Sequence, residues 1–446
     1  MTSGEAARFS KSKHSSKNNL LFQTVMKVRS GRPQQVIAPV FALLLLAVVP
    51  IRALPPSAVL WTAPSILLAA LLIAWAAESA QFFVAQGFAL AILAWLQTLP
   101  EFAVEAVLSW KQEVPLLLAG LTGALRLLTG LGWPMIYFTA SFMHRRRTGQ
   151  KLRRIALEPE HSVEVVGLLA CMAYAAVIWS KASLNLLDAA VLITIYAVYL
   201  IVLHRMPPQK AEDIDELELI PRTIVKSRAP VRIVLIVGLF VLGGALIYFM
   251  AEPFLGSLLA VSATLGVPNF IFIQWVAPFV SEFPEKVSAF YWARTVDRAS
   301  MALMNMVSSN INQWTLLAAM LPIVFSISRG APSTISFDSQ QELEILMTLG
   351  QSLIGALFLI NMELAWWEAA ALFFLWAVQF ALSPVPLSAG FWGMLASHIH
   401  RYITLTYLAW SGVEILRMIV GWRKPAAFQH FAKMWRSHVV PPAGSD

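Results

Sequence analysis

The sequence predicts an all-α polytopic membrane protein, built from two five-helix repeats of inverted topology with one extra helix at each end. Three observations predict this fold class: apolar stretches of membrane-spanning length, a one-sided distribution of basic residues, and an internal repeat. The chain has 446 residues, of which 58% are hydrophobic and 13% charged. Soluble domains carry about a quarter charged residues, so this composition excludes a chain that faces water on all sides.

Apolar stretches recur along the whole chain. A membrane-spanning helix needs about 20 consecutive apolar residues. Charges and prolines divide the chain into about twelve candidate spans: 36–52, 57–79, 82–109, 114–140, 162–180, 184–204, 232–258, 264–291, 299–327, 343–361, 364–382 and 391–420. No small-residue cleavage site follows the first of them, so we expect a retained helix there rather than a signal peptide.

Basic residues mark one side of the membrane. With the N-terminus in the cytoplasm and twelve spans, 26 of the 33 Lys and Arg residues fall in five cytoplasmic segments: 1–32, 144–154, 205–232, 294–298 and 417–446. Because cytoplasmic loops are enriched in Lys and Arg, we predict a plasma (inner) membrane protein with both termini in the cytoplasm. Anionic lipid then explains the net charge of +8, and no nucleic-acid partner is implied.

The sequence also contains an internal repeat. Gln97-Thr-Leu-Pro-Glu101 is followed 184 residues later by Ser281-Glu-Phe-Pro-Glu285. Leu184-Asn-Leu-Leu-Asp-Ala-Ala-Val-Leu192 is followed 180 residues later by Leu364-Ala-Trp-Trp-Glu-Ala-Ala-Ala-Leu372. Each copy holds five spans, and an odd number inverts the second copy relative to the first, as in many secondary transporters.

The repeat divides the chain into seven parts. They are a basic cytoplasmic tail (1–35), an extra N-terminal helix (36–56), the first transporter repeat (57–204), a cytoplasmic loop (205–231), the second transporter repeat (232–382), an extra C-terminal helix (383–420) and a cytoplasmic tail (421–446).

Two prolines, each followed by a glutamate, indicate an ion site. Pro100 and Pro284 each remove an amide donor and interrupt a helix, next to Glu101 and Glu285. A carboxylate within a membrane span is costly and by default suggests function. Oxygen ligands without a His or Cys set favour a hard cation such as Ca²⁺ or Na⁺. The candidate ligands are Glu101, Glu285, Thr98, Gln97, Ser281, Glu282, Asn305, Ser309, Asn310 and Gln313.

Spacing groups these oxygens on shared helix faces. Gln97 and Ser281 each lie four residues before the glutamate of their motif, and Asn305, Ser309 and Gln313 recur at every fourth residue. Residues four apart lie on one face of a helix. A lone proline is more often a kink, and a lone Ser or Thr more often packs between helices. Two proline–glutamate pairs in an inverted repeat favour the ion site.

These residues resemble the sodium/calcium exchangers of the calcium/cation antiporter superfamily. That family has two inverted repeats, each with a G-T-S-[LA]-P-E-like helix and then a helix with G-S-N-x-x-[ND]. The matching elements are Thr98-Leu-Pro-Glu101, Ser281-Glu-Phe-Pro-Glu285 and Ser308-Ser-Asn-Ile-Asn-Gln313. The resemblance implies a ten-helix core over about 57–382, Ca²⁺ held by the two glutamates, and exchange by alternating access.

The first repeat departs from the family pattern over residues 119–128. Gly123 fits, but Ala124, Leu125 and Leu128 replace polar residues, and Arg126 stands where the family has small or polar residues. Arg126 could pair with Glu101 or Glu105 in place of a bound cation, or it could snorkel or pair elsewhere.

Other charges in the spans have simpler interpretations. The acids near span ends are expected mostly to reach the membrane interface; they are Glu78, Asp188, Glu252, Glu368 and Glu414. His398, His400 and Arg401 in the last span could form a proton or pH element, but we expect them to mark a break near the start of a shorter helix.

The sequence therefore favours a secondary antiporter that exchanges Ca²⁺ for Na⁺, with no cofactor and no enzymatic activity. One alternative is proton-coupled exchange of Ca²⁺ or Na⁺, because carboxylates brought close together repel and can carry protons. Another is a transport-deficient homologue of the same fold. An intramembrane hydrolase is disfavoured, since neither H-E-x-x-H nor G-x-S-x-G occurs. The partners are the transported cations and the bilayer.

Overall fold

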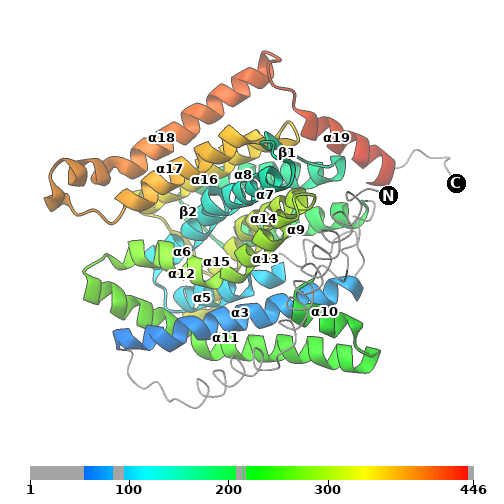
Figure 1. Ribbon diagram of the computed structural model, residues 1–446. Helices are drawn as coiled ribbons and strands as arrows, with labels where there is room; N and C mark the ends of the chain where they lie inside the picture. The colour runs from blue at the N-terminus through cyan, green and yellow to red at the C-terminus, as the bar shows by residue number, and fades with distance from the viewer. Residues whose placement is uncertain (1–54, 84–94, 207–213, 215–216, 440–446) are drawn as a thin grey trace, which may run out of the picture. The chain divides into compact units, whose positions relative to one another are not determined.

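The computed structural model describes residues 55–83, 95–206, 214 and 217–439 (Figure 1). The expected span 36–52, part of the span 82–109 and part of the loop 205–231 lie outside these residues. Within the described residues, seven helical runs are long and apolar enough to cross a membrane. Two shorter apolar helices accompany them, at Asn269–Ser281 and Trp366–Leu382. The number of twelve spans stays a prediction.

The first repeat contains one helix for each expected span, as far as it is described. Its elements are η1 (Pro56–Ala58), α3 (Val59–Ala80), η2 (Gln81–Phe83), α5 (Leu99–Trp110), α6 (Val114–Leu127), η4 (Leu128–Gly132), α7 (Trp133–Thr148), β1 (Arg154–Ala156), η5 (Pro159–His161), α8 (Ser162–Ser180), β2 (Ser183–Leu184) and α9 (Leu186–His204). The short helix α10 (Leu219–Lys226) follows in the connecting segment.

In the second repeat, the α-helices, the π-helical segment and the two short strands follow one another in the same order as in the described part of the first. They are α11 (Ala229–Leu265), α12 (Asn269–Ser281), α13 (Phe283–Arg294), α14 (Ala299–Asn312), η7 (Gln313–Leu317), α15 (Ala318–Arg329), β3 (Ile335–Ser336), α16 (Ser339–Leu359), β4 (Glu363–Ala365) and α17 (Trp366–Leu382). The chain ends in η8 (Leu387–Ala389), α18 (Phe391–Ile419), α19 (Ala426–Met434) and η9 (Trp435–Val439).

Both proline–glutamate motifs lie where a helix restarts. Pro100 is the second residue of α5, and Thr98 before it is the N-cap. Pro284 is the second residue of α13. Glu282, between the two helices, is both the C-cap of α12 and the N-cap of α13. Proline is favoured in a first helical turn because its missing N–H would have no partner there. Both prolines therefore interrupt their spans as the sequence predicts, and each glutamate lies in a first turn.

The two repeats contact each other through reciprocal pairs of elements. α5 packs on α15 and α13 on α7, while α8 packs on α14 and α16 on α6. α3 and α11, the first helices of the two repeats, lie side by side (Figure 1). The short strands follow the same rule, because β1 pairs with β4 and β2 with β3, both antiparallel. This reciprocity is the pattern expected of two copies related by a pseudo-two-fold axis.

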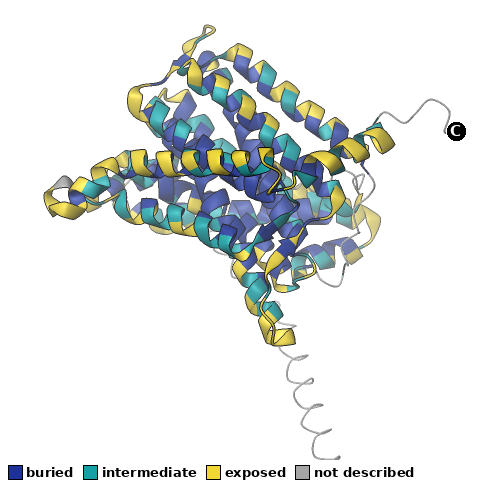
Figure 2. Ribbon diagram, turned by 90° about the horizontal axis from the view of Figure 1, so that it is seen from above, coloured by how far each residue is buried: buried dark blue, intermediate teal, exposed yellow. Residues whose placement is uncertain are grey.

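Apolar side chains occupy both the interior and the outer faces. Buried residues concentrate in the inner helices, and exposed residues follow the outer helices (Figure 2). On α11, Val234, Tyr248 and Phe249 are 69%, 79% and 68% exposed. Exposed apolar surface on this scale suits lipid rather than water. The protein is therefore a polytopic helical membrane protein.

The expectation that the five acids near span ends reach the interface is wrong for four of them. Only Glu252 is exposed, and it pairs with Lys111 at 2.6 Å. Glu78, Asp188, Glu368 and Glu414 are buried, because each accepts hydrogen bonds from buried or partly buried donors.

The expected break near His398 and His400 is also absent from the described residues. α18 runs continuously from Phe391 to Ile419. His400 instead turns toward α16, where its Nδ1 pairs with Glu344.

Candidate functional site

The candidate site forms where the first turns of α5 and α13 meet the end of α14 and the start of η7. Ser309 donates a hydrogen bond to Glu285 Oε1. One turn later, the Gln313 amide donates to Glu101 Oε2 at 2.8 Å and to Glu282 Oε1 at 2.6 Å. A single helix face of the second repeat thus binds the glutamates of both proline–glutamate motifs.

The first repeat reaches the same face through neutral side chains. Asn305 donates to Gln97 Oε1 at 3.3 Å, and Asn312 donates to the Thr98 hydroxyl. The stripe of residues 305, 309 and 313 therefore contacts both motifs along its length. Asn312 belongs to the same segment, but the four-residue spacing that we used to choose ligands passes over it.

Two candidate ligands turn away from the carboxyl groups. Asn310 directs its amide to Thr129 Oγ1 at 3.2 Å, toward the first repeat. Ser281 donates to the Ala277 carbonyl at 3.0 Å, within its own helix. Both side chains are buried beside the site, and each retains an oxygen that can accept from a donor or coordinate an ion.

The site is rich in oxygen atoms without donors. Among the described residues, the buried oxygens that lack a hydrogen-bond partner include Glu101 Oε1, Glu285 Oε2, Asn305 Oδ1, Asn312 Oδ1 and Gln313 Oε1. Buried polar atoms are nearly always satisfied, so such a group calls for a ligand. Carboxylate and amide oxygens suit a hard cation.

Acidic and imidazole groups alone do not make this site. Within the described part of the chain, no three His, Cys, Asp or Glu residues gather as a ready metal site. A cation bound here would need amide and hydroxyl oxygens as further ligands. Glu282 differs from the other carboxylates because its second oxygen pairs with Lys286 on the next turn.

The corresponding face of the first repeat has no polar side chains. The π-helical segments η4 and η7 begin at Leu128 and Gln313, so equivalent positions differ by 185. Gly120 and Ala124 then correspond to Asn305 and Ser309. Ligands from the helix after the proline–glutamate motif therefore come from the second repeat only.

Glu105 fills the space that Gly120 leaves. A Cβ atom added at Gly120 would lie 1.8 Å from Glu105 Oε1. Glu105 is buried, and in the described structure its Oε2 has no hydrogen-bond partner. Its position one turn after Glu101 is visible in the sequence, but its burial against a glycine of the next helix is not.

Arg126 does not pair with Glu101 or Glu105. Its Nη1 lies 2.8 Å from Glu344 Oε2, and both side chains are buried. Gln274 donates to the same carboxylate at 2.9 Å, and the guanidinium stacks 5.3 Å from the Trp275 ring centroid. Of the alternatives that the sequence leaves open, pairing elsewhere is the one observed.

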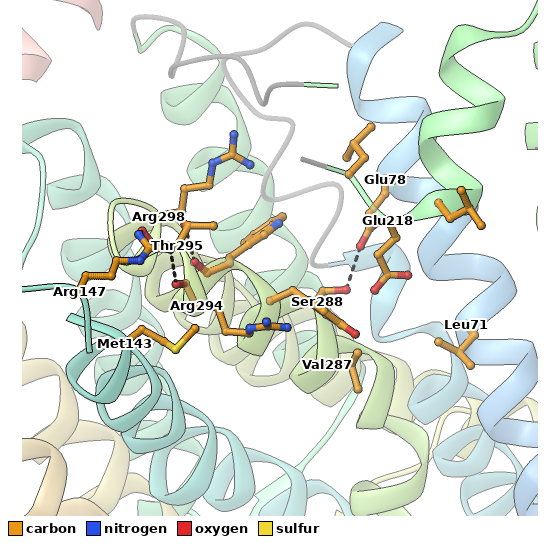
Figure 3. A pocket seen from close by; sticks show the side chains of 14 residues that line it. Leu71, Glu78, Met143, Arg147, Glu218, Val287, Ser288, Arg294, Thr295 and Arg298 are labelled. Carbon is orange, nitrogen blue, oxygen red and sulfur yellow. Dashed lines mark hydrogen bonds between the residues drawn. The ribbon is translucent and has the colours of Figure 1, made fainter. Parts of the chain in front are cut away.

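A separate cavity of about 630 Å³ lies beside the C-terminal half of α13 (Figure 3). Ser288 from its wall donates to Glu78 Oε1 at 2.8 Å. Arg147 from α7 donates to the Thr295 carbonyl at 3.0 Å. Three residues of the cavity wall lie in segments that the charge distribution assigns to the cytoplasmic side: Arg147 in 144–154, and Thr295 and Arg298 in 294–298. Glu285 lies in the first turn of α13, and the cavity lies beside the later turns of the same helix.

Two inverted helical repeats with carboxylates at interrupted helices define a class of protein, the secondary cation transporters. The family model for the sodium/calcium exchanger protein matches residues 56–204 and 235–383. The chain belongs to this family and is a cation antiporter by class. No sequence among the curated proteins compared matches the chain.

Solved structures show the same fold. The structure described as the H⁺/Ca²⁺ exchanger CAX is 28% identical, with a TM-score of 0.79 over 90% of this chain and 97% of that one. The sodium-calcium exchanger NCX_Mj is 16% identical, with a TM-score of 0.51 over 73% of this chain and 97% of its own. YfkE is 13% identical, with a TM-score of 0.51 over 72% and 90%.

Proposed function

We propose that this protein exchanges Ca²⁺ for H⁺ across the membrane by alternating access. The carrying observation is the group of buried oxygens without donors around Glu101, Glu285 and Gln313. Ca²⁺ takes six to eight oxygen ligands from carboxylates, amides and carbonyls, so this set suits it. The ion is the substrate, and no resident cofactor or catalytic activity is proposed.

The proton is our first candidate for the counter-ion. The Gln313 amide donates to both Glu101 Oε2, at 2.8 Å, and Glu282 Oε1, at 2.6 Å, so it holds these two carboxyl groups close together. Two carboxylates held this close repel each other, which favours a proton on one of them. A divalent cation that binds between them repels this proton, so Ca²⁺ and H⁺ compete for one site. The 28% identical exchanger, described as exchanging H⁺ and Ca²⁺, supports the same choice.

Sodium is the second candidate, and it is the one that the sequence favours. The neutral oxygens of Asn305, Asn312 and Gln313 have no donors within the described residues. Neutral oxygens of this kind can coordinate a monovalent cation. The family description, sodium/calcium exchanger protein, supports this reading.

We also propose the route and the orientation. The cavity in Figure 3 serves as the cytoplasmic vestibule, because its wall continues along α13 to Glu285. Its arginines belong to the basic segments that support an orientation with both termini in the cytoplasm of a plasma (inner) membrane protein.

Ion flux into proteoliposomes tests this proposal. Uptake of Ca²⁺ is measured with an outward gradient of H⁺ alone or of Na⁺ alone, at matched membrane potential. We expect the H⁺ gradient to drive uptake, and Glu101→Gln or Glu285→Gln to abolish it by removing a charged ligand. Glu252→Gln, which neutralises an exposed acid, is the matched control.

Each other outcome is informative. Uptake that follows only the Na⁺ gradient replaces the proton by sodium. A folded protein without flux under either gradient indicates the transport-deficient homologue. Flux that survives neutralisation of both Glu101 and Glu285 refutes the site.

A further inference from the structure

A second buried ionisable pair lies at the start of α8, outside the ion site. His161 and Glu164 are both fully buried, and His161 Nδ1 lies 3.7 Å from Glu164 Oε1. This distance is too long for a hydrogen bond. Within the described chain, neither ring nitrogen and neither carboxylate oxygen has a hydrogen-bond partner. A buried charge without a strong partner is expensive, so this pair needs an explanation.

The pseudo-two-fold relation supplies a built-in comparison, because Glu164 and Glu344 occupy equivalent positions. Glu164 lies eight residues after the end of β1 and nineteen before the start of β2. Glu344 lies eight residues after the end of β3 and nineteen before the start of β4. Both carboxylates are fully buried on the helix between the two short strands of their repeat.

The two halves differ at the position that supplies the cationic partner of Glu344. Glu344 is neutralised by Arg126, which lies two residues before η4. The equivalent residue, two before η7, is Ile311. Its Cδ1 would lie 3.4 Å from a Cβ at Gly167, one turn after Glu164. The position that holds a permanent cation for Glu344 thus holds an aliphatic side chain in the other half, and the imidazole of His161 is the ionisable group that lies next to Glu164 among the described residues.

We propose that His161 and Glu164 form a proton-binding site, distinct from the transport site. One bound proton makes the pair neutral, whether it resides on the imidazole or on the carboxyl. Its release leaves a buried negative charge. The proton thus takes the role that the Arg126 guanidinium has at Glu344, but it can come and go. Imidazole is the side chain suited to such exchange near neutral pH.

The surroundings connect this site to the transport site. The other ionisable groups that bear on the pair are Glu158 and Glu160 from its own segment, and Tyr199 from α9. The Tyr199 hydroxyl lies 3.0 Å from Ser308 Oγ on α14, and α14 packs on α8.

α14 also presents Ser309 and Asn312 to the two proline–glutamate motifs. A change in the charge of the pair therefore acts on the helix that supplies the cation ligands. Because the basic segment 144–154 leads into β1, a few residues before His161, the pair lies near the predicted cytoplasmic end of α8 and would report cytoplasmic pH.

The test measures the thermal midpoint of the purified full-length protein from pH 5 to pH 9, which requires no transport. We expect a pH-dependent step in the wild type, and its loss or a shift of at least about one pH unit, a tenfold change in proton affinity, in Glu164→Gln and in His161→Gln. The double variant should resemble either single variant, since the two residues act as one site. Glu252→Gln should keep the wild-type step.

Other outcomes overturn the inference. Profiles of the variants that superimpose on the wild type show that the pair is only structural. A step that moves with Na⁺ concentration at constant pH shows that the site binds a metal cation and not a proton. If Glu164→Gln does not fold, His161→Gln alone decides. Because the readout is stability, a failure of the proposed Ca²⁺/H⁺ exchange leaves this test intact.

Discussion

Replacement of Arg126 by Met should destabilise the protein more than any other single change to the Arg126–Glu344 network. The guanidinium contacts Glu344 at 2.8 Å and donates through Nε to the Thr122 carbonyl at 3.1 Å. Removing one partner of a buried ion pair costs about 3–5 kcal/mol, because the other charge stays buried. Gln274 and His400 still contact Glu344, so we expect a loss near the lower limit, about 3 kcal/mol.

A double-mutant cycle separates this penalty from loss of packing. Arg126→Met combined with Glu344→Gln removes the pair together, and replacing a whole buried pair is often nearly neutral. We therefore expect the double variant to be more stable than the sum of the two single effects predicts, with a coupling free energy of about 2 kcal/mol. Unfolding is followed in detergent with denaturant. A double variant as unstable as the sum of the two single variants would refute this account.

Three further predictions concern the site and the topology. Gly120→Ala should displace the Glu105 carboxyl, because Glu105 Oε1 lies 1.8 Å from the new methyl position. We expect this variant to weaken Ca²⁺ uptake at least tenfold in the proteoliposome assay. Gly244→Ala is the control and should leave uptake unchanged, because its new methyl group meets no atom within 4 Å. Glu282→Gln should flatten the pH dependence of Ca²⁺ uptake if H⁺ is the counter-ion, whereas a variant that responds to a Na⁺ gradient and changes little with pH would favour sodium. Thr223→Cys, in the exposed face of α10, should react with an impermeant thiol reagent only from the cytoplasmic side, and labelling from outside intact cells would reverse the topology.

Features that depend on local chemistry could be predicted from the sequence. Proline disfavours a continuous helix, so the interruptions at Pro100 and Pro284 could be predicted from the sequence, although Pro64 and Pro253 lie inside unbroken helices. The stripe of Asn305, Ser309 and Gln313 follows from helical periodicity alone. The structure brings all three into contact with the proline–glutamate motifs.

Features that depend on distant partners could not be predicted. Glu344 lies more than 200 residues from Arg126, and no local pattern connects them. The acids near span ends were expected at the interface because nothing in the sequence shows their donors. Asp188, for example, is held inside by Lys181 and by its own helix cap.

The reciprocal strand pairs have an evolutionary consequence. Because β1 pairs with β4 and β2 with β3, each repeat is completed by strands of the other, as the two chains of a symmetric dimer would be. In a dimer of identical chains, every substitution appears twice, once in each half. A single chain with two copies escapes this constraint, so one half can carry Arg126 while the other carries Ile311. Likewise, one half carries Asn305 where the other half carries Gly120 at the equivalent position. Fusion of the two halves is thus what allows one half to supply the polar face while the other carries a fixed positive charge.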